Sequence, residues 1–267
     1  MNELELETLA QFAREILLPA GAEVLTAIYT DYCDGKDIGI QTKGDNSPAS
    51  AADREAENAI RYLIQNIYPD HGIWGEEYGT FQLDADWVWI LDPLDGTKEF
   101  LAKNPHHFGL LIGLFYQGKP AYGLIHDPIS DETWGTRIET STPNAQKSIA
   151  DATIACTNRS MFEKKDAQSA LNAVLDDAQA EHNLMNCIGF AKVADGSIDA
   201  VIEADLNLHD IAAILPVLFQ SGATVTDFVG KNYKDYSFSF DDYGQRGYDI
   251  LASHDTKLIE EILGEIQ

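Results

Sequence analysis

The chain has 267 residues and a formal net charge of -26 at neutral pH, so it is long enough for one large domain or two closely packed halves. The charge argues against nucleic acid or an anionic membrane surface as the main partner, because both bind basic patches. Three widely spaced cysteines and the lack of a signal-peptide pattern predict a cytoplasmic protein with reduced thiols. No apolar run approaches the ~20 residues that a membrane span requires.

The first 145 residues are predicted to form an α+β half. Apolar residues at helical spacing predict an N-terminal helix, or a kinked pair of helices around Pro19. After a Gly-, Asp- and Lys-rich stretch, Ser50 begins a second helix that ends before Pro69. A turn at 117–119 is typical of a hairpin. Strands are predicted at 87–91, 108–116, 120–125 and 133–137.

Residues 146–267 are predicted to form a second, α/β half. The composition turns to Thr, Pro, Asn, Gln and Ser over 141–150, which favours a boundary there. An amphipathic helix over 210–221 contains Pro216, where we expect a kink. The other predicted elements are strands near 153–155, 200–203, 224–228 and 249–252, and helices at 165–176, 188–194 and from 255 onward. The alternation predicts a layered α/β or α+β enzyme-like fold.

The segment 87–100, WVWILDPLDGTKEF, is the most informative part of the chain. Its apolar start is typical of a buried strand, and Pro93 is expected to turn the chain, so that Asp92 and Asp95 leave the strand end together. Oxygen-only ligands suit Mg²⁺ or Mn²⁺, whereas zinc prefers His and Cys. The sequence therefore predicts a hard-metal site at this strand end.

Gly96 and Thr97 follow the two aspartates. A glycine lets the backbone approach an anion closely, and Thr97 offers a hydroxyl and a backbone N–H at a helix start. One alternative is an ordinary helix cap, although two aspartates plus Gly-Thr exceed what capping needs. Another is the class of phosphatases with an aspartyl nucleophile in D-x-D-G-T, but the spacing here is D-x-x-D-G-T.

Two aspartates do not complete a hard-metal site, so further carboxylates are expected nearby. Glu76 lies in a Gly-Glu-Glu segment, Asp53 lies three residues after Ser50, and Asp210 begins an apolar helix. Each has a structural interpretation when taken alone: a solvated turn for Glu76, and helix caps for Asp53 and Asp210.

Taken together, these positions resemble the inositol monophosphatase family. Gly75-Glu76-Glu77, D-P-L-D-G-T at 92–97 and H-D-I-A-A at 209–213 occur in that family's order, and 43–53 matches its upstream segment. The resemblance spans about residues 43–230. It implies a layered α/β/α/β/α sandwich of the inositol monophosphatase and fructose-1,6-bisphosphatase type, Mg²⁺-dependent hydrolysis of a small phosphate monoester, and a homodimer.

The resemblance also implies roles for individual residues. The implied metal ligands, for two or three Mg²⁺ ions or for Mn²⁺, are Glu76, Asp92, the Leu94 carbonyl, Asp95 and Asp210. Thr97, helped by Glu76 or Asp53, would orient the attacking water. Gly96 and Thr97 would hold the phosphate, and Glu203 and His209 would contact the rest of the substrate.

The residues around these motifs resemble different branches of the family, which act on different substrates. His209 replaces the usual Trp or Tyr, and Lys98-Glu99-Phe100 resembles the branch that acts on adenosine bisphosphates. Residues 45–57 and 70–79 resemble the bacterial histidinol-phosphate branch, and Glu203 suits a polyol or an ammonium group. We expect histidinol phosphate or inositol 1-phosphate. The alternatives are adenosine 3′,5′-bisphosphate, fructose 1,6-bisphosphate, or a non-catalytic scaffold that binds a phosphometabolite or a partner protein.

Overall fold

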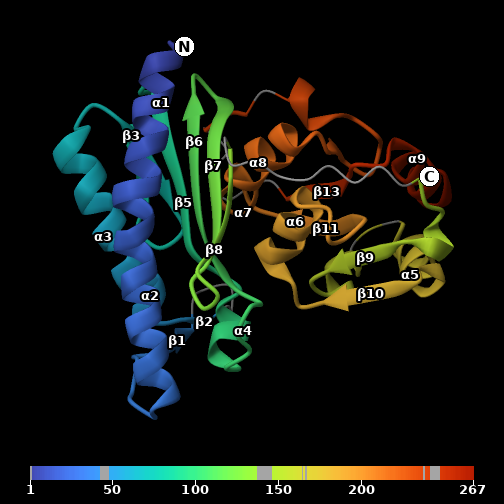
Figure 1. The fold of residues 1–267 in the computed structure, drawn as a ribbon, viewed down its shortest axis with the longest axis horizontal. Helices are drawn as coiled ribbons and strands as arrows, with labels where there is room; N and C mark the ends of the chain where they lie inside the picture. The colour runs from blue at the N-terminus through green and yellow to red at the C-terminus, as the bar shows by residue number, and fades with distance from the viewer. Residues whose placement is uncertain are drawn as a thin grey trace.

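The computed structural model describes residues 2–42, 48–136, 146–163, 165, 167–236, 238–240 and 247–267. Helices and sheets alternate in five layers (Figure 1), so the predicted α/β/α/β/α sandwich is confirmed. Among these residues, no helix combines the length and the apolar character needed to cross a bilayer.

The N-terminal helices cover one face of a six-stranded sheet (Figure 1). These helices are α1 (Glu3–Phe12), a π-helical turn (Ala13–Leu17), α2 (Leu18–Cys33) and α3 (Ala51–Ile67). The strands lie in the order β4 (Gly79–Phe81), β3 (Gly72–Gly75), β5 (Trp87–Asp95), β6 (Gly109–Tyr116), β7 (Lys119–Asp127) and β8 (Glu132–Gly135). The short strands β1 (Gln41–Thr42) and β2 (Pro48–Ala49) pair separately, and α4 (Thr97–Leu101) follows β5.

A second helical layer lies between this sheet and a five-stranded sheet, whose outer face carries two more helices (Figure 1). The inner helices are α6 (Asn186–Ala194), α7 (Leu208–Ala212) and α8 (Ile214–Ser221), and the outer ones are α5 (Gln168–Asp177) and α9 (Thr256–Ile266). The strand order is β10 (Ala180–Asn183), β9 (Thr153–Cys156), β11 (Ala200–Leu206), β13 (Tyr248–Ser253) and β12 (Thr224–Thr226). Short 3-10 turns occupy Ile149–Asp151, Arg159–Phe162 and Tyr233–Asp235.

The alternation of side chains along β5 joins two hydrophobic cores. Trp87, Trp89 and Leu91 pack in the core beneath the N-terminal helices, while Val88 and Ile90 pack in the core that contains α6–α8. Successive strand residues point to opposite faces, so a continuous apolar run is what a strand covered on both sides requires. The strand that carries Asp92 and Asp95 is therefore held rigidly in the middle of the molecule.

Most predicted helices and strands are confirmed. The structure differs from the prediction at the helix that contains Pro216 and at several short strands. The helix predicted over 210–221 is divided at Ala213, because Pro216 has no N–H to bond the Ala212 carbonyl. The strands β1, β2, β3, β4 and β10 were not predicted, since two to four residues carry too little periodicity. The strand predicted at 133–137 ends at Gly135, and Arg137 lies outside the described residues.

The predicted boundary between halves at 145/146 adjoins 137–145, which also lie outside the described residues. The six-stranded sheet uses residues before it and the five-stranded sheet uses residues after it. The division into two halves stays a prediction.

Candidate active site

Asp92 and Asp95 lie in a β-bulge. In the pairing of β5 with β6, Asp92 is opposite Leu111 and Asp95 is opposite Gly109, so three steps along β5 match two along β6. The prediction that the strand ends at Leu91 was therefore wrong: it continues to Asp95, and the extra residue accommodates Pro93, which lacks an N–H. Residues three apart point to opposite faces of a regular strand, so the bulge lets both carboxylates share one site.

Four carboxylates and one histidine converge there. Ligand atoms of Asp92, Asp95 and Asp210 lie within 4.8 Å of one another, as do those of Glu76, Asp92 and His209. Asp92 belongs to both groups and joins them into one cluster. Glu76 comes from the turn after β3, the two aspartates from β5, and His209 and Asp210 from the first turn of α7. The structure thus brings together every side chain that the sequence analysis assigned as a metal ligand.

The cluster holds more negative charge than its own hydrogen bonds balance. Burial raises the pKa of Asp92 well above its usual value, and the nearby Glu76 and Asp95 raise it further. Burial, with Asp210 next in importance, raises the pKa of Asp95 to about 7, although the Cys187 hydrogen bonds oppose this. Carboxylates crowded in this way fit a divalent cation, whose charge would offset their repulsion, and the oxygen ligands suit a hard one.

Asp210 differs from the other members of the cluster. Burial favours its neutral form, but His209 and the hydrogen bonds from Asn207 outweigh burial and lower its pKa. The Asn207 N–H donates to Asp210 Oδ2 at 2.7 Å, and His209 Nε2 lies 3.1 Å from Oδ1. Asp210 therefore caps α7, as its position at a helix start suggested, and faces the cluster as well.

Asp53 likewise combines a structural and a site position. Its Oδ2 accepts hydrogen bonds from the Ser50 N–H at 2.6 Å and the Ser50 hydroxyl at 2.7 Å, which completes a capping box on α3. Its Oδ1 lies 2.9 Å from Thr97 Oγ1, which is also 3.2 Å from the Leu94 carbonyl. The cap fixes this fully buried carboxylate so that it can orient the Thr97 hydroxyl.

A pocket of about 350 Å³ opens beside the cluster, a volume typical of small-molecule sites. Its lining includes Glu76, Asp95, Gly96, Thr97, Asn186 and Asp210. The φ of Gly96 is 90°, which favours glycine, and a Cβ there would lie 2.8 Å from Asn186 Nδ2. The fold therefore requires glycine at position 96, and the backbone of this residue lines the pocket without a side chain.

A smaller cavity of about 60 Å³ shares Asp95, Asn186 and Asp210 with this pocket and is also lined by Glu203. Glu203 Oε1 accepts the Thr157 N–H at 2.7 Å, whereas Oε2 is buried without a hydrogen-bond partner among the described residues. Burial raises the pKa of Glu203 to about 8. A solvent-exposed role for Glu203 is therefore excluded, because this side chain is only 1% exposed.

Residues 98–100, which follow the D-P-L-D-G-T motif, have three different environments. Phe100 is fully buried and packs against Phe108, so it belongs to the core. Glu99 accepts a hydrogen bond from Asn186 Nδ2 at 3.1 Å, and Lys98 lines the pocket. Sequence reasoning missed Asn186, which lies more than 80 residues away from its partner and has no motif to mark it.

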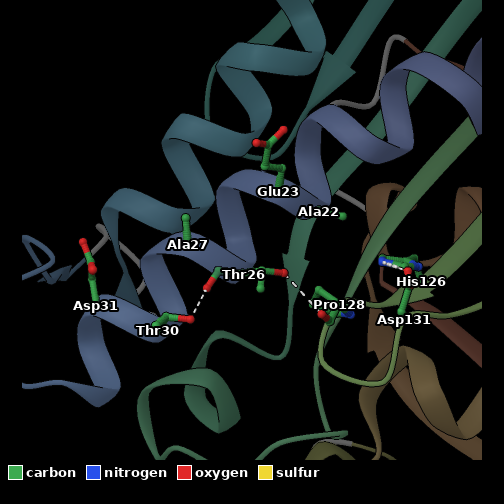
Figure 2. A pocket seen from close by; sticks show the side chains of 9 residues that line it. All are labelled: Ala22, Glu23, Thr26, Ala27, Thr30, Asp31, His126, Pro128 and Asp131. Carbon is green, nitrogen blue, oxygen red and sulfur yellow. Dashed lines mark hydrogen bonds and ion pairs between the residues drawn. The ribbon is translucent and has the colours of Figure 1, made fainter.

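The largest hollow that we describe lies elsewhere. About 680 Å³ is enclosed loosely between α2 and the turn after β7, where Thr26 Oγ1 donates to the Pro128 carbonyl at 3.2 Å (Figure 2). Glu23, Asp31 and Asp131 give it an acidic lining, and none of the clustered carboxylates reaches it. We assign the chemistry to the pocket of about 350 Å³, because it is lined by carboxylates of the cluster, by the Thr97 hydroxyl and by the bare backbone of Gly96.

Comparison with known proteins shows the family to which the chain belongs. The Inositol monophosphatase family profile matches residues 5–267. The chain is 35% identical over 244 residues to the bifunctional phosphatase IMPL2, chloroplastic, of Arabidopsis thaliana, covering 87% of this chain and 68% of that protein. It is 27% identical to a histidinol-phosphatase of Chlorobaculum parvum, covering 83% and 86%, and 31% identical to the Nus factor SuhB of Escherichia coli, covering 70% and 74%.

Among solved structures, an inositol monophosphatase from Zymomonas mobilis superimposes with a TM-score of 0.78 at 26% identity, covering 97% of this chain and 98% of that one. The family profile extends over almost the whole chain, and the clustered carboxylates all lie within the range that it matches. The chain therefore belongs to the inositol monophosphatase family, a family of phosphatases that hydrolyse phosphate monoesters.

Proposed function

We propose that this phosphatase hydrolyses a small phosphate monoester with Mg²⁺, through direct attack by water. The observation that carries the proposal is the convergence of Glu76, Asp92, Asp95 and Asp210 beside the Thr97–Asp53 pair, in a pocket of ligand size. These four side chains and the Leu94 carbonyl would hold the ions. Bound Mg²⁺ would supply positive charge to the phosphate and acidify a water molecule.

The protein's own groups would position the reactants. Asp53 accepts a hydrogen bond from the Thr97 hydroxyl, so the lone pairs of Thr97 Oγ1 are left to accept a hydrogen bond from the attacking water. Glu76, at the pocket edge, would hold that water from the other side. The Gly96 and Thr97 backbone N–H groups would bind phosphate oxygens, since charge on a phosphate is stabilised by such donors. No protein nucleophile is required.

We propose histidinol phosphate as the substrate, with inositol 1-phosphate second. Glu203 supports this choice, because one of its buried oxygens has no hydrogen-bond partner among the described residues and would accept one from a cationic or hydroxyl-rich leaving group. A cationic group would also hold this carboxylate in its ionised form against the effect of burial, which a second phosphate would not do. The similarity to a histidinol-phosphatase and to a bifunctional phosphatase also supports it. His209 faces Glu76 and Asp92 and does not line either cavity, so its contact with substrate stays a prediction, as do the homodimer and the cytoplasmic location.

The test is a panel of histidinol phosphate, inositol 1-phosphate, fructose 1,6-bisphosphate and adenosine 3′,5′-bisphosphate, assayed by phosphate release with Mg²⁺ or with EDTA. We expect Mg²⁺-dependent release, fastest from histidinol phosphate. Glu203→Gln should lower kcat/KM for histidinol phosphate by about 10–100-fold, while p-nitrophenyl phosphate, which lacks the cation, changes little. No metal-dependent turnover on any phosphate ester would sink the proposal, and preference for adenosine 3′,5′-bisphosphate would refute the argument from Glu203.

A further inference from the structure

A second acidic residue of α3, Glu57, lies one helical turn after Asp53 and makes no contact with the pocket. Its side chain is fully buried, and both carboxylate oxygens accept hydrogen bonds. Oε2 accepts the Glu77 N–H at 2.7 Å, and Oε1 accepts the Tyr78 N–H at 3.1 Å. The Arg61 Nε donates to Oε1 at 2.6 Å. A buried charge satisfied in this way is costly to disturb.

The segment that Glu57 holds is the turn between β3 and β4, which carries Glu76. Arg61 completes the arrangement, because its Nη2 donates to the Gly79 carbonyl at the far end of the turn. On the other side, the Glu76 N–H donates to the Leu91 carbonyl of β5 at 3.1 Å. The backbone of the turn is thus fixed to α3 and to the strand that leads into Asp92.

Gly75 shows how close this contact is. A Cβ at Gly75 would lie 2.0 Å from Glu57 Oε1 and 2.4 Å from Glu57 Cδ, so only glycine lets the turn approach the carboxylate. Gly75 immediately precedes Glu76, so the close approach to Glu57 lies next to the residue whose carboxylate joins the cluster.

We propose that Glu57, held by Arg61, is a positioning residue that sets the Glu76 carboxylate in the metal cluster. Asp53 and Glu57 are four residues apart and so lie on the same face of α3. One helix face therefore fixes both the partner of Thr97 and the turn that carries Glu76. This inference rests on the proposed function, since it assumes that Glu76 binds metal. Glu57 acts on Glu76 through the backbone of the turn, and altering groups that orient a metal ligand typically changes metal affinity by about 10–100-fold.

The test compares Mn²⁺ binding, followed by the EPR signal of free Mn²⁺, in the full-length wild type and in Glu57→Gln. The amide has one carbonyl oxygen for three donors, and its NH₂ group faces an N–H donor. We expect Mn²⁺ affinity to fall about 10–100-fold. The Mg²⁺ concentration for half-maximal phosphatase activity should rise by a similar factor, with kcat at saturating Mg²⁺ reduced far less. Glu55→Gln, exposed on the same helix, is the matched control and should change neither value.

A folded Glu57→Gln variant that melts earlier but binds Mn²⁺ with wild-type affinity would overturn the inference and leave the pair a purely structural one. Arg61→Lys is a milder second variant, because it keeps a cation beside Glu57 but cannot bridge to the Gly79 carbonyl as well. We expect it to lower Mn²⁺ affinity several-fold, and wild-type affinity in this variant would also overturn the inference. If the wild type itself neither binds Mn²⁺ nor hydrolyses phosphate esters, the proposed function fails. That outcome is distinct from failure of this inference, in which the wild type binds Mn²⁺ and the variants bind it equally well.

Discussion

The crowding of carboxylates predicts that Asp95→Asn gains stability while it loses activity. Asp95 has its pKa raised from 3.8 to about 7 by burial and by Asp210. At pH 8 the ionised form is therefore disfavoured in the metal-free fold by at most roughly 4 kcal/mol, since each pH unit corresponds to about 1.4 kcal/mol. Asp95 is partly exposed, so solvent screening reduces this figure to about 1–2 kcal/mol.

Asparagine removes the charge, keeps the shape and retains an oxygen that can accept the Cys187 N–H. In EDTA at pH 8 the variant should therefore melt roughly 2–8 °C above the wild type. With Mg²⁺ the order should reverse, because the wild type gains binding energy that the variant cannot. Turnover of p-nitrophenyl phosphate should fall by about 10³-fold or more, because a direct metal ligand is lost.

Differential scanning fluorimetry and a phosphate-release assay measure both effects. Asp84→Asn, an exposed aspartate before β5, is the matched control and should change neither the melting temperature nor the activity. A lower melting temperature for Asp95→Asn in EDTA would refute the argument from repulsion. Undiminished Mg²⁺-dependent turnover would refute the assignment of Asp95 as a ligand.

Three further outcomes are expected. Thr97→Val removes the hydroxyl that lies 2.9 Å from Asp53 Oδ1, so kcat should fall about 10²–10⁴-fold with Mn²⁺ affinity within threefold of wild type; an equal loss in both would make Thr97 part of the metal site. His209→Trp should change the ranking of substrates more than metal affinity, and the reverse result would identify His209 as a ligand. In EDTA the folded protein holds extra protons on Asp95 between pH 3.8 and about 7, so stability falls as pH rises through this window. The melting temperature should be higher at pH 6 than at pH 7.5, and Mg²⁺ should raise it more at pH 7.5; equal Mg²⁺ effects at both pH values would contradict this.

Local patterns were enough to predict most helices and strands. Ser50 marks the start of α3 and Asp255 the start of α9, because capping is decided by residues within one turn. The apolar run from Trp87 likewise predicts a strand buried on both faces. The predicted end of β5 at Leu91 was wrong, because pairing with β6 continues the strand through a bulge that contains Pro93. No local rule requires this bulge.

The candidate site divides in the same way. Part of the site could be predicted from the sequence, since Asp92, Asp95, Gly96 and Thr97 are close together in the chain and their side chains and backbone suit metal and phosphate binding. Asn186 and Arg61 were not, because an amide or a guanidinium acquires its role only from the groups opposite it. The i, i+4 spacing of Asp53 and Glu57 was a signal that could have pointed to one shared helix face.

The sequence by itself indicated the kinds of element through periodicity, and it indicated the family and the reaction through the resemblance of four segments, at 43–53, 75–77, 92–97 and 209–213. Only the tertiary structure decided that Asp92 and Asp95 share one face, through a bulge whose register depends on β6. It also decided that Glu203 is buried with one oxygen that has no hydrogen-bond partner among the described residues, and that Glu57 holds the turn of Glu76. The physical reason is that burial, desolvation and close backbone approach depend on residues far apart in the chain, which no local pattern encodes.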